Sequence, residues 1–140
     1  MAELDNDRRA AENQRLKEEW VSALIELVKQ LKQWTFEQIK EWEKDPEQGV
    51  VPCAIETTTE RQEEYLGKYF APMLVITSEE SEVVVSPVGR FALGAIGQVS
   101  MTNNRQSFNF LYSRKKGWYV MENRKPLTRE MFIELLKQMC

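Results

Sequence analysis

The stretch that most constrains this chain is Leu16–Trp42, in which apolar residues recur every three or four positions. At about 100° per residue, Trp20, Leu24 and Leu31 fall on one side of a helix, and most polar residues fall on the other side. An unbroken helix over Asp7–Lys44 would be ~57 Å long at ~1.5 Å per residue. Such a helix is longer than a small sheet is wide, so the rest of the chain must be arranged along it.

The apolar arc of this helix spans roughly 200° of its circumference, whereas a helix that packs on one core usually shows a stripe of a little over ~100°. Part of the arc is therefore predicted to face a protein partner or a second copy of the chain. Three of the four tryptophans lie in this stretch, and large aromatic side chains are enriched at interface centres. The predicted partner-binding residues are Leu16, Trp20, Leu24, Leu27, Leu31 and Trp34. The alternative is that the entire arc is core and serves folding alone.

The margins of the arc are the residues expected to remain for a partner if its centre packs on a sheet. One margin carries Val21, Ile25 and Val28. The other margin carries Leu16, Ala23, Leu27 and Trp34. The sequence does not decide which margin faces the sheet.

Local signals set the limits of the helical region. Asp5–Asp7 offers N-capping residues, and the charged segment 1–15 is predicted to fray. Thr35 is followed three residues later by Gln38, a capping-box pattern, so the helix either runs on unbroken or kinks and restarts near Thr35. Asp45-Pro46 ends the helical region, because the residue before a proline avoids the helical conformation.

From Val50 onward the apolar pattern changes to a period of two, which predicts strands. The predicted strands are Val51–Thr59, Tyr69–Thr77, Glu82–Pro87, Phe91–Met101, Gln106–Ser113 and Trp118–Glu122. Short polar or glycine-containing turns at 78–81, 87–90, 102–105 and 114–117 separate the later strands, which predicts an antiparallel meander. Residues 60–69 fit either a short helix over Arg61–Gly67 or the second half of a long edge strand.

Two glycines interrupt the strand pattern at Gly94 and Gly97. A glycine inside a strand marks a bulge or the close approach of another group. The long helix crossing the sheet is the expected neighbour, since the segment has neither the lysine nor the spacing of a phosphate-binding loop.

The C-terminal segment predicts a second, short helix. Thr128 is the expected N-cap, and Glu130 in the first turn suits the positive end of the helix dipole. Its apolar face carries Met131, Phe132, Leu135, Leu136 and Met139. The chain is therefore predicted to be one α+β domain over residues 1–140, with a long N-terminal helix packed on an antiparallel meander of five or six strands and a short C-terminal helix.

The composition removes several classes of function. The chain has no histidine, which excludes the commonest general base and zinc ligand. Its net charge is −3, so no global positive field attracts nucleic acid. No apolar run reaches the ~20 residues that span a bilayer, and no secretion signal precedes the helix, which predicts a cytoplasmic protein without membrane contact.

The remaining chemical groups do not form a recognisable active site. Cys53 and Cys140 have no spacing typical of a metal site or a disulfide framework, and both are expected to be free, with Cys53 at least half-buried. The acidic stretches around Glu60–Glu64 and Glu79–Glu82 are expected to be solvated surface. The sequence thus predicts no enzyme, no metal and no cofactor.

Two further hypotheses compete with protein binding. Basic residues beside aromatic ones in the hairpin 112–125 resemble a single-stranded nucleic-acid site, although charged hairpin tips also serve solubility. The residues of this alternative are Arg114, Lys115, Lys116, Arg124 and Lys125. A small-ligand pocket between helix and sheet is the other alternative, lined by Tyr65, Tyr69, Phe91, Phe108, Phe110 and Trp118.

The wide apolar arc, the missing catalytic groups and the acidic charge together favour a protein-interaction module. We expect an adaptor, inhibitor, chaperone or immunity-type protein that binds another protein and forms a homodimer. Nucleic-acid binding is the less favoured hypothesis.

Overall fold

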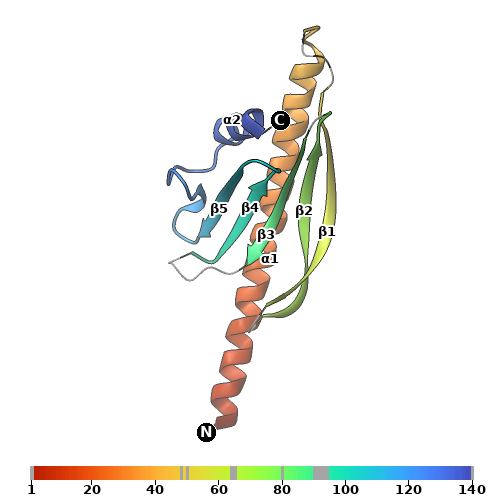
Figure 1. Cartoon of the computed structure of the whole chain (residues 1–140). Helices are drawn as coiled ribbons and strands as arrows, with labels where there is room; N and C mark the ends of the chain where they lie inside the picture. Colours follow the sequence, from red (N-terminus) through yellow and green to blue (C-terminus); the bar gives the residue numbers. More distant parts are fainter. Residues whose placement is uncertain are drawn as a thin grey trace.

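The computed structural model describes residues 2–47, 49, 51–63, 66–79, 81–89 and 95–139, and side chains from Arg8 onward. The elements are α1 (Ala2–Glu43), β1 (Cys53–Glu63), β2 (Gly67–Thr77), β3 (Glu82–Gly89), β4 (Gly97–Thr102), β5 (Ser107–Ser113), β6 (Gly117–Val120) and α2 (Arg129–Met139). The six strands form one antiparallel sheet in sequence order, along which α1 runs lengthwise (Figure 1). This arrangement confirms the predicted α+β fold with a long first helix, a meander and a short last helix.

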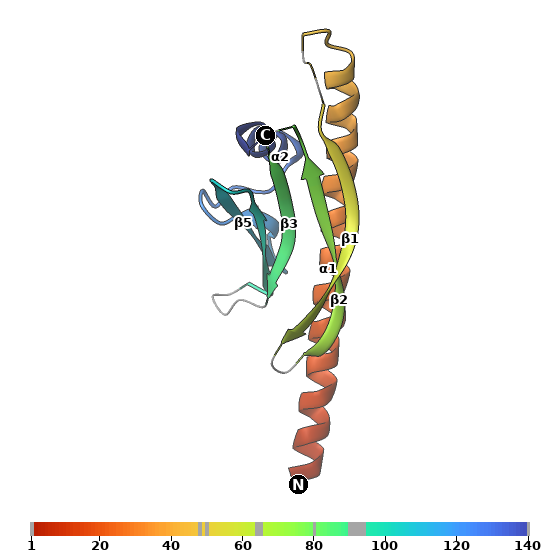
Figure 2. The same ribbon diagram turned by 45° about the vertical axis from the view of Figure 1, so that its right-hand side comes forward.

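The first helix is uninterrupted from Ala2 to Glu43, so the predicted start near Asp7 is wrong, and of the two alternatives at Thr35 the continuous helix is the one formed. Thr35 is fully buried, and its hydroxyl donates to the carbonyl oxygen of Leu31 at 2.7 Å. A capping threonine would instead accept a hydrogen bond from a backbone N–H further along the chain. The first turns of α1 extend past the end of the sheet in both views (Figures 1 and 2).

The hydrophobic core lies between the two helices and the inner face of the sheet. Trp20 from α1, Phe110 from β5 and Phe132 from α2 are fully buried in it. At Gly97 an added Cβ would lie 2.4 Å from the Trp20 ring. The helix therefore approaches the sheet closely at this glycine, as the sequence predicted, whereas Gly94 lies outside the described residues.

The sheet is divided into a two-stranded ribbon, β1–β2, and a four-stranded part, β3–β6. The ribbon is paired along its whole length, but β2 and β3 pair only from Leu74↔Val85 to Thr77↔Glu82. Continued in the same register, that ladder would place Pro72 opposite Pro87, and neither residue has an N–H to donate. The ladder ends at Leu74↔Val85, two positions before these prolines would meet, and the ribbon turns away from β3 (Figure 2).

Residues 60–69 belong to this ribbon, so the short helix considered for Arg61–Gly67 is wrong. The first strand continues past Thr59 to Glu63, which confirms the long-edge-strand alternative, and the second strand begins at Gly67. Tyr69 and Ala71 of the second strand are buried in the core. This burial favours the extended conformation, because alternate side chains of a strand face the same side.

The turn predicted at 87–90 is also misplaced. The third strand runs through Pro87 to Gly89, and a β-bulge between these two residues opposite β4 accommodates the proline. Of the long strand predicted over Phe91–Met101, the structure shows β4 from Gly97, with Ala95 and Ile96 outside it. Arg90 and residues 91–94 lie outside the described part.

The second helix is fixed at both ends. Its predicted N-cap is confirmed, since the Met131 N–H donates to the Thr128 hydroxyl at 3.2 Å. At the other end, Ser81 and Asn103 donate side-chain hydrogen bonds to the Met139 carbonyl at 3.2 and 2.9 Å. The turns before β3 and β5 thus hold the C-terminal end of α2 over the inner face of the sheet.

Candidate interaction surface

The predicted partner-binding residues lie mainly in the core. Trp20, Leu24, Leu27 and Leu31 are at most 3% exposed, and Leu16 and Trp34 are half-buried against the same cluster. The sheet and α2 cover them, so in this conformation the four buried side chains offer no surface to a partner.

One margin of the apolar arc nevertheless remains partly exposed. Ile25 is 54% and Phe36 is 41% exposed, while Val21 and Ile39 are half-buried. At about 100° per residue, these four side chains and Lys32 fall within roughly 60° of the helix circumference. We call Val21, Ile25, Phe36 and Ile39 the α1 flank. The sequence predicted Val21 and Ile25 as marginal positions, whereas it also placed Val28 there, which is buried.

The α1 flank lies on the same side of the molecule as β1. Lys32, which falls on the same arc of the helix, reaches Glu56 of β1 with 3.2 Å between Nζ and Oε2. On the opposite side of the helix, Trp34 packs on Phe132 with ring centroids 6.1 Å apart, and Glu37 contacts Arg129. Figure 1 accordingly shows β1 and α2 on opposite sides of α1.

The first strand is an uncovered sheet edge. It pairs with β2 on one side, and no described residue pairs with its outer edge. Its central residues Thr57 and Thr58 are exposed, and Ile55 is 58% exposed. An 11-residue strand in this position presents a row of unpaired backbone N–H and C=O groups, which is a template for pairing with another chain.

The other edge of the sheet is protected. The chain after β6 folds back along it, so that Val120 N–H donates to the Lys125 carbonyl at 2.9 Å and Leu127 N–H donates to the Trp118 carbonyl at 3.0 Å. The last strand also has four residues only. Natural sheets shield their edges in this way, so the contrast singles out β1.

The charges of β1 do not shield its edge strongly, because two of its acids are matched by lysines. Besides the Lys32–Glu56 pair, Lys68 of β2 lies 4.0 Å from Glu60. These ion pairs are exposed and contribute little to stability. They do reduce the like-charge repulsion that an approaching strand would meet.

The outer face of the sheet adds apolar surface next to this edge. The register places Ile55, Val75 and Val84 side by side across β1, β2 and β3. Thr102 of β4, which pairs with Val84 and continues this row, is polar. The neighbouring outward-facing pair on β4 and β5, Ser100 and Asn109, is polar as well. An apolar centre with a polar surround is typical of a protein interface.

The basic residues of the nucleic-acid hypothesis are not gathered into one patch. Arg114–Lys116 forms the turn before β6, whereas Arg124 and Lys125 lie beyond its other end. Arg114 is engaged by Glu19 of α1, with Nε–Oε1 and Nη2–Oε2 distances of 2.7 and 2.9 Å. These hydrogen bonds, with a Coulomb contribution from the same guanidinium, lower the pKa of the Glu19 carboxyl below its ordinary value. Arg114 therefore ties the turn to the helix.

The aromatic residues of the small-ligand hypothesis fill space in the core. Tyr69 and Phe110 are buried, Phe108 and Trp118 pack against the core cluster, and Tyr65 and Phe91 lie outside the described residues. The Tyr69 hydroxyl accepts a hydrogen bond from Trp20 Nε1 at 3.0 Å and donates to Glu63. This polar chain joins α1 to the ribbon.

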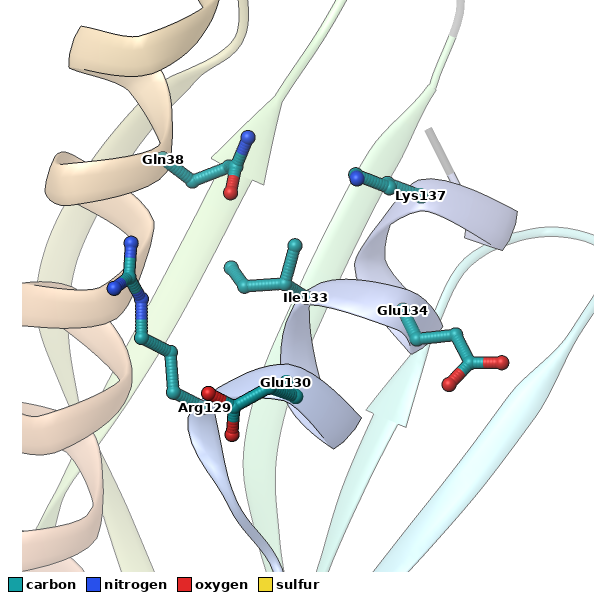
Figure 3. Close-up of a pocket in the computed structure, with 6 residues that line it drawn as sticks. All are labelled: Gln38, Arg129, Glu130, Ile133, Glu134 and Lys137. Carbon is teal, nitrogen blue, oxygen red and sulfur yellow. The ribbon is translucent and has the colours of Figure 1, made fainter.

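A cavity is present elsewhere, between α1 and α2 (Figure 3). It is an open groove of about 320 Å³ lined by Gln38, Arg129, Glu130, Ile133, Glu134 and Lys137. Arg129 at its border is engaged by Glu37, with 3.4 Å between Nε and Oε2. Its shallow, mixed-charge lining lacks the convergent polar groups and enclosed apolar walls of a small-molecule site.

Groups suited to chemistry are sparse in the part of the chain that the structure describes. Cys53 is exposed at the start of β1, so the expectation of a half-buried thiol is wrong. No cluster of His, Cys, Asp and Glu among the described residues suits a metal ion. Within the same ranges, no helix is both long enough and apolar enough to cross a membrane.

Comparison with known proteins gives no relative from which a role can be transferred. No protein-family model matches the chain, and no curated protein or solved structure does so either. The candidate surface therefore depends on its own geometry.

Two residues of this surface were missed in the sequence. Phe36 lies within about 20° of Ile25 on a helical wheel, and Ile55 alternates with polar residues in a threonine-rich strand. The wheel would have identified Phe36 had Thr35 not been interpreted as a helix start.

Proposed function

We propose that this protein is an interaction module that binds another protein chain through the side formed by the β1 edge and the α1 flank. The observation that supports the proposal is that the uncovered 11-residue edge and the exposed flank residues Ile25 and Phe36 lie on one side. Backbone groups of an open edge provide affinity for an extended segment, and apolar side chains beside it provide specificity.

The binding residues proposed here, Ile25, Phe36 and the β1 edge, differ from the partner-binding residues predicted from the sequence. The kind of function is the same as the sequence predicted. An adaptor, inhibitor, chaperone or immunity-type protein needs a recognition surface and no catalytic group. The absence of histidine in the sequence supports a non-enzymatic role. The exposed thiol of Cys53 is best tolerated in a reducing compartment, which supports the cytoplasm.

The test is capture with matched variants. The wild-type chain, the double variant Ile25→Glu/Phe36→Glu and the control Met121→Glu are immobilised in parallel. Each is offered an extract of the source organism and, separately, an untagged copy of the chain. Met121 is 38% exposed and lies after β6, away from the proposed side, so its substitution adds a charge without touching that side.

We expect wild type and Met121→Glu to retain the same protein and the double variant to lose it, because charge on the flank leaves two carboxylates to be desolvated on binding. Circular dichroism of all three proteins establishes that they are folded. Equal retention by all three, or retention of no protein by any of them, would contradict the proposal.

A further inference from the structure

We infer that the chain which occupies this side is a second copy of the same protein, with β1 of each copy paired antiparallel about Thr57. This inference rests on the proposed function and names its partner. Two-fold symmetry requires one surface to complement itself, and both the strand and the helix can be tested for that property.

The strand sequence favours an axis at Thr57 over one at the neighbouring Thr58. In a two-fold antiparallel pair the residue on the axis faces itself. An axis at Thr58 would place Glu56 opposite Glu60 of the second copy, twice, and like charges directly opposite are destabilising. An axis at Thr57 instead places Thr57 opposite itself and Ile55 opposite Thr59 of the second copy, and no like charges face each other.

The α1 flank is self-complementary about a point of its own. In an antiparallel pair of helices centred near residue 30, Val21 lies opposite Ile39 of the second copy, and Ile25 lies opposite Phe36. Lys29 then lies opposite Lys32 of the second copy, and the Glu56 carboxylate 3.2 Å from the Lys32 ammonium offsets that like charge. All four side chains are at least partly exposed in the single chain. Packing them together would remove the apolar surface that α1 leaves outside its own core.

An ion pair relates the heights of the two centres in the molecule. The chain turns back between α1 and β1, so the two elements run in opposite directions, and the Lys32 ammonium reaches the Glu56 carboxylate. A step of one residue along the strand advances ~3.3 Å. This is about the length of two residues of the helix, at ~1.5 Å each, counted back toward its N-terminus. The ion pair therefore sets Thr57 near the level of residue 30, within the reach of a lysine side chain, so that one axis can serve both strand and helix.

The spacing across the axis also fits. Paired strands lie ~4.8 Å apart, and α1 packs against both β1 and β2. Because α1 packs more extensively on β2 than on β1, its axis lies no nearer the edge than midway between those strands, and the two α1 axes would be at least about 10 Å apart, the upper end of the ~8–10 Å of packed helices. The flanks would then add apolar area to the strand hydrogen bonds, as a stable dimer requires.

Disulfide cross-linking tests the register. In a Cys53→Ser/Cys140→Ser background, Thr57→Cys places two thiols opposite each other, at the ~4.5–5.5 Å between Cα atoms that a disulfide accepts. Thr58→Cys is the control, since its two copies would be displaced along the strands by two residues, to roughly 8 Å. We expect covalent dimers from Thr57→Cys and at least tenfold less from Thr58→Cys after mild oxidation.

Sedimentation equilibrium of the unmodified chain tests the partner. We expect a concentration-dependent dimer, weakened at least tenfold by Ile25→Glu/Phe36→Glu and unchanged by Met121→Glu. A monomer at every concentration overturns the inference, as does preferential cross-linking at Thr58→Cys. If such a monomer still captures a different protein through the flank, the proposed function stands while the self-pairing fails.

Discussion

The contact between Trp20 and Gly97 sets how closely α1 lies on the sheet. A methyl group at Gly97 would meet the fully buried indole at 2.4 Å. We expect Gly97→Ala to lower the free energy of unfolding by about 1–3 kcal/mol, the usual cost of overpacking a core. Urea denaturation measures this change, and Trp20→Phe in the same chain should recover part of the loss because the smaller ring leaves room.

Gly117 provides the comparison for that experiment. Its φ is +70°, and nothing lies within 4 Å of an added Cβ. Gly117→Ala should therefore cost roughly 1 kcal/mol from backbone strain alone, and Trp20→Phe should not reduce this cost. If Trp20→Phe rescued both glycine variants equally, crowding at Gly97 would not be the cause of its effect.

Thr35 shows what a short sequence pattern omits. The capping-box pattern at Thr35 is present in the sequence, but in the folded chain the hydroxyl bonds to Leu31 and the side chain is 0% exposed. Tertiary burial decides between the two uses of a threonine, and a local pattern has no information about burial. The same applies to Cys53, whose β-strand position was predicted and whose exposure at an open edge was not.

At the scale of the helix, the continuity of α1 can be tested at Thr35. Thr35→Asp would preserve an N-cap, but in an unbroken helix it buries an unpaired carboxylate, so we expect a loss of several kcal/mol or complete unfolding. Thr35→Val keeps the shape and should change stability by about 1 kcal/mol or less. Thermal unfolding followed by circular dichroism separates the two, and a stable Thr35→Asp would contradict a continuous helix.

The link between α1 and the β5–β6 turn should depend on pH. The folded-state pKa of Glu19 is lowered by Arg114, so its contribution to stability is present above the unfolded-state pKa of about 4.3 and is lost as the pH falls through the folded-state value. Wild type should melt at most a few degrees above Glu19→Gln at neutral pH, and this difference should vanish on acidification. Arg114→Gln should behave like Glu19→Gln, and a difference that persists at low pH would exclude the ion pair as its source.

At the scale of elements, periodicity predicted both helices and most strands, because each has one buried face. The strand ends were harder to place. Pro87 is typical of a turn, but a bulge lets the third strand continue past it. The residues that stop the β2–β3 ladder, Pro72 and Pro87, are 15 positions apart in the numbering, and their opposition appears only once the register is known.

The candidate surface could be predicted only in part from the sequence, because it is what remains when the core is complete. A wide apolar arc indicated that α1 has more than one apolar neighbour. Trp20, Leu27 and Trp34 pack against the sheet and α2 in the core, whereas Ile25 and Phe36 stay exposed. Which margin stays exposed depends on the side on which α2 packs, and no local pattern encodes this.

At the scale of the whole molecule, the divided sheet predicts two regions of different local stability. The ribbon is joined to β3 by four residue pairs and by Arg61, whose Nη2 donates to the Val88 carbonyl at 2.6 Å. Loss of one charge-assisted hydrogen bond costs about 1.5 kcal/mol, which is roughly tenfold in an opening equilibrium. We expect Arg61→Ala to accelerate amide exchange about tenfold in β1 and β2 and to leave β4 and β5 unchanged.

Hydrogen exchange with mass spectrometry resolves the two regions, since peptides from the ribbon and from β4–β5 do not overlap. Arg105→Ala, at an exposed position in the β4–β5 turn, is the matched control and should leave the ribbon unaffected. Equal acceleration across the entire sheet in Arg61→Ala would mean that the ribbon and the four-stranded part open together. Selective acceleration would show that the ribbon, including the β1 edge, can move relative to the rest of the sheet, and pairing of that edge with another chain should then slow its exchange.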